Sequence, residues 1–230
     1  MMDFSGKHVV VTGGTGALGS ATVGMLLKAG ASCTVPYQHE AEAQRFAHGG
    51  DPNVKLIAVA DLADEAMVAK VYDGLVLWAS IHIAGGFAPG TVAETGRAAL
   101  MAQLDGNLVS CFLCCRAAVR AMGGGGRIVN VAARPALEWR SGAGMTAYTI
   151  AKTGVAALTV ALAEEVAKAG ILVNAVAPSI MDTPANRKTM PKADFDAWPK
   201  VEEVAATILF LASPDNRVTR GAVVPVYGKS

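Results

Sequence analysis

The sequence predicts an α/β fold in which helices cover both faces of one parallel, seven-stranded sheet. Short apolar runs rich in β-branched residues alternate with longer segments of helical spacing, the rhythm of repeated strand–helix–strand units. A length of 230 residues fits one domain, and no linker, repeat or low-complexity tract divides it. Apolar residues make up 52% of the chain and 25 residues are glycine, a composition suited to close packing of helices on a sheet.

The strands are predicted at the apolar runs short enough to be buried on both faces: 7–12, 32–36, 54–59, 80–84, 127–131, 171–176 and 222–226. The segments between them carry apolar residues at helical spacing and are predicted as helices: 17–29, 64–73, 98–122, 146–169 and 202–212. Right-handed crossovers place such helices on both faces of the sheet, so the fold is doubly wound. A ligand is then expected in the crevice at the carboxyl ends of the strands.

The charge balance and the N-terminal residues exclude several classes of partner. The chain has 20 Lys and Arg against 19 Asp and Glu, so we expect neither nucleic acid nor a membrane surface as a partner. Residues 1–7 contain no clean basic leader, and a glycine-rich turn interrupts the uncharged stretch that follows. We expect no signal peptide and no membrane span, and therefore a cytoplasmic protein.

The cysteines are Cys33, Cys111, Cys114 and Cys115, and their spacing is not that of a secreted disulfide framework. The last three share one helical face, but a tetrahedral metal needs a fourth ligand, and the four histidines lie elsewhere in the sequence. We expect these cysteines to be small core hydrophobes and predict no metal site.

The first predicted strand is followed by a glycine-rich turn, Gly13 to Gly19, that opens directly into a helix. Glycine lets the backbone turn sharply and approach a ligand, and a helix N-terminus offers unpaired N–H groups to a pyrophosphate. In this strand-to-helix context the turn predicts a dinucleotide-binding (Rossmann) loop. A purely structural turn is the alternative.

The second signal is Tyr148 and Lys152 inside the predicted helix 146–169. A separation of four residues places both side chains on one helical face, about one turn apart. A cation there favours the phenolate, so Lys152 is expected to lower the pKa of Tyr148 and make it a proton donor or acceptor near working pH. Two unrelated surface side chains are the alternative.

With these motifs in order along essentially its whole length, the chain resembles the short-chain dehydrogenase/reductase family. That family combines a glycine-rich loop, an Asn-Leu-x-Ser segment, a Tyr-x-x-x-Lys pair and a Pro-Gly turn. They correspond here to 13–19, 107–110, Tyr148 with Lys152, and 177–180, where Ser179 replaces the glycine. The resemblance implies that residues 1–230 form one NAD(P)-binding domain.

The resemblance also implies roles for individual residues. Tyr148 is the general acid/base, Lys152 holds the nicotinamide ribose and tunes Tyr148, and Asn107 organises a water of the proton relay. Asp61 and Leu62 would meet the adenine, and Ile180 and Thr183 the carboxamide of the nicotinamide. The full set of implied cofactor-binding residues is Gly13, Thr15, Gly16, Ala17, Leu18, Gly19, Tyr37, Gln38, Asp61, Leu62, Ala84, Gly85, Gly86, Asn107, Tyr148, Lys152, Pro178, Ile180 and Thr183.

The largest departure from the family pattern is Ala133, which stands where the catalytic serine is expected. Within the family, dihydropteridine reductase-like members also work without that serine. The chain resembles them most in residues 182–198, which predict a substrate loop, with Ala133, Met190 and Trp198 facing the substrate. Anchoring of the loop to the core by Phe195 and Trp198 is the alternative. His82, where most members have asparagine, is expected to be a satisfied strand-end polar group.

These observations lead to an NAD(P)-dependent oxidoreductase acting on a small quinonoid dihydropterin-like or carbonyl substrate. The alternatives are a general ketone or 3-oxoacyl reductase, favoured by Asn107, and a catalytically impaired NAD(P)-binding sensor, suggested by the missing serine. The strand at 32–36 runs into Tyr37, Gln38 and His39 without a carboxylate, which favours NADP(H) over NAD(H). The apolar faces of helices 98–122 and 146–169 predict a homodimer or homotetramer.

Overall fold

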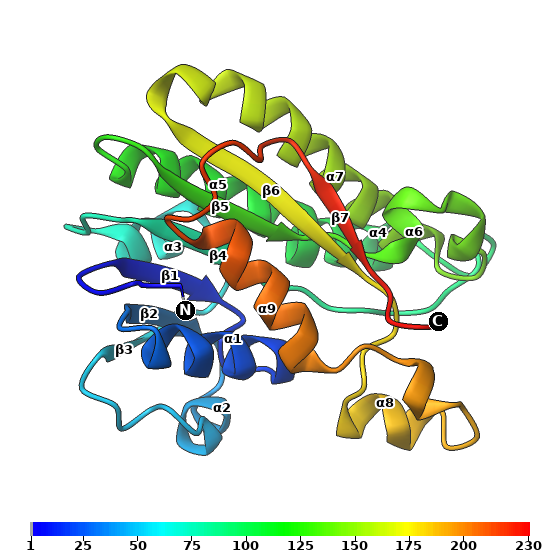
Figure 1. The fold of residues 1–230 in the computed structure, drawn as a ribbon. Coiled ribbons are helices and arrows are strands. Elements are labelled where there is room, and N and C mark those ends of the chain that lie inside the picture. Colours follow the sequence, from blue (N-terminus) through cyan, green and yellow to red (C-terminus); the bar gives the residue numbers. More distant parts are fainter. Residues whose placement is uncertain (1) are drawn as a thin grey trace.

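The predicted sheet is present, with seven parallel strands in the order β3-β2-β1-β4-β5-β6-β7 (Figure 1). The computed structural model describes residues 2–230. Its strands are β1 His8–Thr12, β2 Ser32–Tyr37, β3 Val54–Ala58, β4 Ala79–His82, β5 Gly126–Val131, β6 Ile171–Pro178 and β7 Val223–Val226. The strand order reverses beside β1, where β1 pairs with both β2 and β4. This reversal creates the crevice in which such sheets bind ligands.

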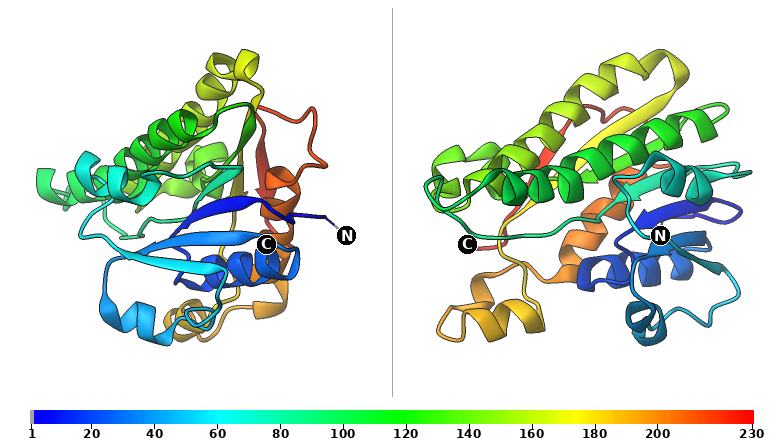
Figure 2. Two further views of the ribbon diagram at one scale, coloured as in Figure 1. Left: turned by 90° about the vertical axis from the view of Figure 1, so that its left-hand side faces the viewer. Right: turned by 180° about the vertical axis from the view of Figure 1, so that it is seen from behind.

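Helices connect the strands and lie on both sides of the sheet (Figure 2). They are α1 Ala17–Lys28, α2 Glu40–Arg45, α3 Glu65–Tyr72, α4 Arg97–Leu104, α5 Ser110–Ala121, α6 Arg134–Leu137, α7 Thr146–Glu165, α8 Pro184–Thr189 and α9 Val201–Ala212. A π-helical turn, Asp105–Val109, joins α4 to α5, and short 3₁₀ turns occupy Trp139–Gly142, Ala167–Ala169 and Phe195–Ala197.

The core consists of two apolar layers, one on each face of the sheet. Helices α3, α5 and α7 supply one layer, which includes Val71, Leu113 and Val155. Helices α1 and α9 supply the other, which includes Leu26 and Ile208. Both layers cover the same sheet, so the single-domain, doubly wound fold predicted from the sequence is confirmed.

The single helix predicted at 98–122 is in fact interrupted by the π-helical turn. Asn107 lies in this turn, and its side-chain Nδ2 donates to the Gln103 carbonyl at 3.0 Å and to the Gly86 carbonyl at 2.9 Å. The side chain thus ties the helix to the loop after β4. Three short helices, α2, α6 and α8, were also missed because four to six residues are too few to show a periodic apolar face.

Two helical segments, Arg97–Ala121 and Thr146–Glu165, are long and apolar enough by length and composition to cross a membrane. In the fold, α5 and α7 lie against the sheet and bury one side in its core, whereas α4 buries no residue fully. Their other sides expose large apolar residues, including Phe112, Ile150 and Val160. The two segments with the length and composition of a membrane-spanning helix therefore contain core helices that have an apolar outer face.

Candidate active site

A cavity of about 540 Å³ opens at the carboxyl ends of β1, β2, β3 and β4. Its lining combines the glycine-rich turn with the loops after the next three strands and the π-helical turn. The lining residues are Gly13, Thr15, Gly16, Ala17, Leu18, Gly19, Pro36, Tyr37, Gln38, Glu42, Val59, Ala60, Asp61, Leu62, Ile83, Ala84, Gly85, Gly86, Gly106 and Ser110. Every cofactor residue expected from the first four strands is among them.

The glycine-rich turn is shaped so that side chains could not replace its glycines. Gly13 has a φ of +67°, and a Cβ placed on it would lie 2.6 Å from the backbone nitrogen of Ala84. A Cβ on Gly14 would lie 2.7 Å from Val35. The turn leads directly into α1. At the start of this helix Gly16 and Ala17 are exposed, and no side chain among residues 2–230 caps its backbone N–H groups. This geometry suits a bound pyrophosphate.

The far end of the cavity is polar and carries negative charge. Asp61 follows β3, with its Oδ1 accepting from the Ala63 amide at 2.8 Å, and Gln38 donates to the Ala60 carbonyl at 2.8 Å. Glu42, from α2, also lines the cavity, and its carboxylate lies 3.4 Å from the Thr15 hydroxyl. No Lys or Arg lines the cavity within the described residues. The sequence prediction missed Glu42 because it missed α2.

Asn107 and Lys152 meet behind Gly85, although they are 45 residues apart in the sequence. A Cβ on Gly85 would lie 2.5 Å from Asn107 Oδ1 and 3.4 Å from Lys152 Nζ. Asn107 Oδ1 is buried and has no hydrogen-bond partner among residues 2–230. An acceptor buried this way is costly unless a ligand or water satisfies it. The orphaned oxygen therefore marks the place where a bound cofactor or its water completes the site.

Tyr148 and Lys152 lie on one face of α7, as predicted, but they do not interact as expected. The Lys152 Nζ donates to the Val131 carbonyl at 2.8 Å and lies 5.9 Å from the centre of the Tyr148 ring. Phe87 packs edge-on against that ring, 5.1 Å between centroids. The Lys152 ammonium is thus hydrogen-bonded to the main chain at the end of β5. The Phe87 ring packs against the Tyr148 ring.

The predicted direction of the Tyr148 pKa shift was wrong. Burial raises the pKa of Tyr148 to about 12, instead of Lys152 lowering it. Burial also lowers the pKa of Lys152 to about 8, because a buried ammonium loses its hydration. The local spacing of the pair was correctly predicted, but desolvation outweighs the attraction between the two side chains.

Ala133 lies two residues after β5, is buried, and is the N-cap residue of α6, without a side-chain cap hydrogen bond. Its methyl group supplies no hydroxyl at the expected serine position. The nearby Ser141 is exposed and donates to the Glu138 carbonyl at 2.7 Å. This hydroxyl is used in a local turn and does not replace the missing serine.

The segment 182–198 forms a loop after β6 that contains α8. Pro178 ends β6, Ile180 is exposed, and the Thr183 hydroxyl accepts from the Asn186 amide at 3.2 Å as the cap of α8. None of these three lines the 540 Å³ cavity, which ends short of the β6 loop. The structure therefore does not bring the residues predicted for the carboxamide, Ile180 and Thr183, into the cavity.

Within this loop, Trp198 is only 8% exposed and packs against Phe195, with ring centroids 5.1 Å apart. Arg187 lies over Phe195 and binds Asp182 through two hydrogen bonds, 2.6 and 2.8 Å long. Trp198 therefore anchors the loop, the alternative left open by the sequence. Met190, at the end of α8, is partly exposed.

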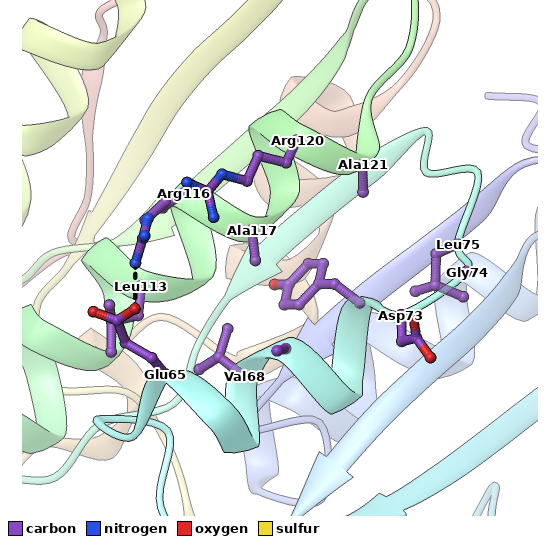
Figure 3. A pocket seen from close by; sticks show the side chains of 12 residues that line it. Glu65, Val68, Asp73, Gly74, Leu75, Leu113, Arg116, Ala117, Arg120 and Ala121 are labelled. Atoms are coloured by element: carbon purple, nitrogen blue, oxygen red, sulfur yellow. Dashed lines mark hydrogen bonds and ion pairs between the residues drawn. The ribbon is translucent and has the colours of Figure 1, made fainter.

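A second cavity, of about 390 Å³, lies between α3 and α5 (Figure 3). Tyr72, Leu113 and Ala117 form part of its apolar wall, and Arg116 at its rim is paired with Glu65. It contains none of the residues predicted for the active site. The glycine-rich turn and the convergence at Gly85 both belong to the first cavity, which defines a nucleotide-dependent enzyme of the doubly wound class.

Comparison with known proteins agrees with this assignment to a nucleotide-dependent enzyme of the doubly wound class. A family model described as enoyl-(acyl carrier protein) reductase matches residues 14–228. Galactitol 2-dehydrogenase from Rhizobium johnstonii is 33% identical, over 96% of this chain and 93% of its own. The chain belongs to the short-chain dehydrogenase/reductase family of NAD(P)-dependent oxidoreductases.

Two solved structures extend the likeness to the whole fold. One is an apo short-chain oxidoreductase from Pseudomonas aeruginosa PAO1 containing an atypical catalytic center, with a TM-score of 0.88, 26% identity, and coverage of 98% of this chain and 97% of that one. The other is a blue fluorescent protein from a metagenomic library in complex with NADPH, with a TM-score of 0.86, 27% identity, and coverage of 99% and 98%.

Proposed function

We propose that this enzyme reduces a small quinonoid heteroaromatic substrate of the dihydropterin type. The observation that carries the proposal is Ala133, which stands two residues after β5 where the family pattern has its catalytic serine. A ketone reductase uses a serine there to hold the substrate oxygen, where negative charge develops during hydride addition. A quinonoid ring develops no alkoxide, so its reduction does not require that hydroxyl.

The residues of the site have separable tasks in this reaction. NAD(P)H, when bound, supplies the hydride. The exposed start of α1 holds the pyrophosphate, Asp61 the adenine, and Lys152 the ribose. Tyr148 donates the proton to the substrate. Because burial raises its pKa to about 12, its phenol is protonated at neutral pH, the form required for reduction.

The loop 182–198 supports a flat, polar substrate. Its aromatic pair, Phe195 and Trp198, fixes the loop to the body of the protein, and the Arg187–Asp182 pair stiffens its base. A loop held in this way after β6 can cover the nicotinamide end of the site. Met190 is its partly exposed apolar residue and the proposed substrate contact.

Selectivity between the two cofactors is a separate part of the proposal. The sequence favoured NADP(H) because β2 ends without a carboxylate. The cavity, however, contains the Glu42 carboxylate and lacks Lys and Arg among its described residues. A carboxylate near the adenosine ribose repels the additional 2′-phosphate. We therefore favour NADH, although the metagenomic blue fluorescent protein of the same fold carries NADPH.

A general ketone or 3-oxoacyl reductase is the second candidate, favoured by the position of Asn107 in the π-helical turn. A 3-oxoacyl-[acyl-carrier-protein] reductase from Pseudomonas aeruginosa is 37% identical over 53% of this chain. The third candidate is a protein that senses the cofactor without turnover. It is favoured by the hydrogen bond of Lys152 Nζ to the Val131 carbonyl, because this bond directs the ammonium away from Tyr148.

Parallel turnover assays separate these candidates. Wild type should reduce quinonoid dihydropterin faster than a panel of ketones, and Ala133→Ser should leave the pterin rate unchanged or lower it. Tyr148→Phe should lose turnover while binding NADH within a few-fold of wild type, because the phenol contributes little ground-state affinity. If the substrate is a ketone, Ala133→Ser should raise kcat/KM by roughly tenfold, equivalent to about 1.4 kcal/mol.

Ketone turnover by wild type without pterin turnover contradicts the proposal and supports the second candidate. Tight NADH binding with turnover of neither substrate supports the sensor.

A further inference from the structure

The core beneath the cofactor cavity holds a group of side chains that the proposed reaction does not use. His82 ends β4, Asn130 lies on β5, and Cys111 and Cys115 lie one turn apart on α5. Each is at most 5% exposed. The ligand atoms of His82 and of the two cysteines all lie within 4.8 Å of one another. We refer to these four residues as the thiol–imidazole cluster.

Three of the separations among the four ligand atoms fall within the range found around a tetrahedral ion. Asn130 Oδ1 is 2.8 Å from His82 Nδ1, 3.3 Å from Cys111 Sγ and 3.5 Å from Cys115 Sγ, and the last sulfur is 3.5 Å from His82 Nδ1. A tetrahedral zinc ion with bonds of about 2.0 to 2.3 Å separates its ligand atoms by roughly 3.3 to 3.8 Å. Small side-chain shifts would bring the four atoms to these separations.

The orientation of the Asn130 amide directs its oxygen into the cluster. Asn130 Nδ2 donates to the Thr159 hydroxyl at 2.9 Å, which turns the amide oxygen toward the cluster. The imidazole Nδ1–H and the two thiols are then three donors directed at one oxygen, which has two lone pairs. A cation bound to these atoms would take the place of the donor hydrogens, with the amide oxygen, the imidazole nitrogen and the two sulfurs facing it.

We propose that the thiol–imidazole cluster is a binding site for one thiophilic divalent cation of the zinc type. Its ligands are His82 Nδ1, Cys111 Sγ, Cys115 Sγ and Asn130 Oδ1. Both thiols lose a proton on binding, so two protons are released for each ion, and two thiolates neutralise the charge inside the core. No oxidation or reduction takes place. The sequence analysis predicted no metal site; His82 and Asn130 are distant from the cysteines in sequence, and only the fold brings the four residues together.

The surroundings of His82 suit such a ligand. A metal on Nδ1 places the imidazole proton on Nε2, and Ser80 Oγ lies 2.8 Å from that nitrogen to accept it. Tyr72 Oη lies 2.8 Å from the same Ser80 oxygen. Tyr72 also lines the 390 Å³ cavity between α3 and α5, and its Oη lies 3.4 Å from His82 Nε2. That cavity is the route by which we expect the ion to enter.

Binding would connect β4, β5 and α5 through one ion, directly behind the active site. The π-helical turn with Asn107 immediately precedes α5, and Val131, whose carbonyl binds Lys152, follows Asn130. We expect the ion to stabilise the framework that positions both catalytic side chains.

The test is anaerobic titration of the reduced, purified chain with CoCl₂ in chelator-treated buffer. We expect one cobalt per chain, the charge-transfer absorption of thiolate-bound cobalt and the strong visible bands of a tetrahedral ion. ZnCl₂ should abolish these bands and release two protons per ion, measured with an indicator dye. Protein expressed with added zinc should carry one ion by elemental analysis. Absence of an ion from both preparations, or the weak spectrum of octahedral cobalt, overturns the proposal.

Variants of the four cysteines provide matched controls. Cys111→Ala and Cys115→Ala should each weaken binding by roughly 100-fold or more, because loss of even an outer partner of a metal ligand commonly costs 10- to 100-fold. Cys114→Ala and Cys33→Ala remove equally buried thiols from outside the cluster and should bind like wild type. Equal losses in all four variants contradict the assignment. The wild-type titration decides independently if a variant does not fold.

Discussion

Lys152 has opposing effects on catalysis and on stability. Its ammonium is buried and bonded to one main-chain carbonyl, in a place where a cofactor ribose would provide further partners. Without those partners the folded chain carries most of the desolvation penalty of the charge. Binding of the cofactor and protonation of Lys152 should therefore favour each other.

Lys152→Met should make the fold more stable than wild type at pH 7, while weakening NADH binding and turnover. The pKa of Lys152 falls from 10.5 unfolded to about 8 folded. Below pH 8 both states are protonated and the penalty is complete, about 3 kcal/mol. Between pH 8 and 10.5 the unfolded state binds more protons, so wild-type stability rises with pH and the difference from Lys152→Met shrinks.

Urea unfolding of both proteins at pH 7 and pH 10 measures this difference. Lys168→Met, at an exposed site, serves as the control and should show no such pH dependence. A stability difference between wild type and Lys152→Met that is the same at both pH values contradicts the assigned pKa.

At the scale of elements, two local irregularities bring functional groups to the cavity. The π-helical turn aims Asn107 at the loop after β4, where a regular helix would direct the side chain elsewhere. The short helix α2 carries Glu42 to the lining of the cavity, 3.4 Å from the Thr15 hydroxyl. Both elements are short, and both contribute through one side chain.

The position of α2 leads to a prediction about cofactor choice. We expect wild type to bind NADH at least about tenfold more tightly than NADPH, a difference of about 1.4 kcal/mol. Glu42→Ala should reduce this ratio and Glu42→Arg should reverse it, because a guanidinium pairs with the 2′-phosphate. Fluorescence titration with both cofactors measures the ratio.

Glu165→Ala removes the same charge from the end of α7, away from the cavity, and should leave the ratio unchanged. Tighter binding of NADPH by wild type would show that Glu42 does not set the preference.

For the whole molecule, the outer faces of α5 and α7 are its most conspicuous unpaired surface. Phe112 is 51% exposed and Val160 is 47% exposed, on helices that lie on the same side of the sheet (Figure 2). Burying this surface against a second copy would remove it from water. We propose a homodimer or homotetramer formed through these helices.

Light scattering at micromolar concentration should give a dimer or tetramer for wild type. Phe112→Glu and Val160→Glu should each shift it toward monomer, because either carboxylate would be desolvated in the interface. Val76→Glu changes an apolar residue that is 89% exposed outside these helices and should leave the mass unchanged. A monomeric wild type contradicts the proposal.

The sequence by itself determined the features that depend on neighbours along the chain. Strand and helix periodicity, the turn from Gly13 to Gly19, and the four-residue spacing of Tyr148 and Lys152 are all local, so they could be predicted and were confirmed. The tertiary structure decided what depends on residues far apart in sequence. It brought Glu42 to the cofactor cavity and joined His82 to Cys111 and Cys115. It also set the direction of the Tyr148 pKa shift, because desolvation depends on how deeply the folded chain buries each group.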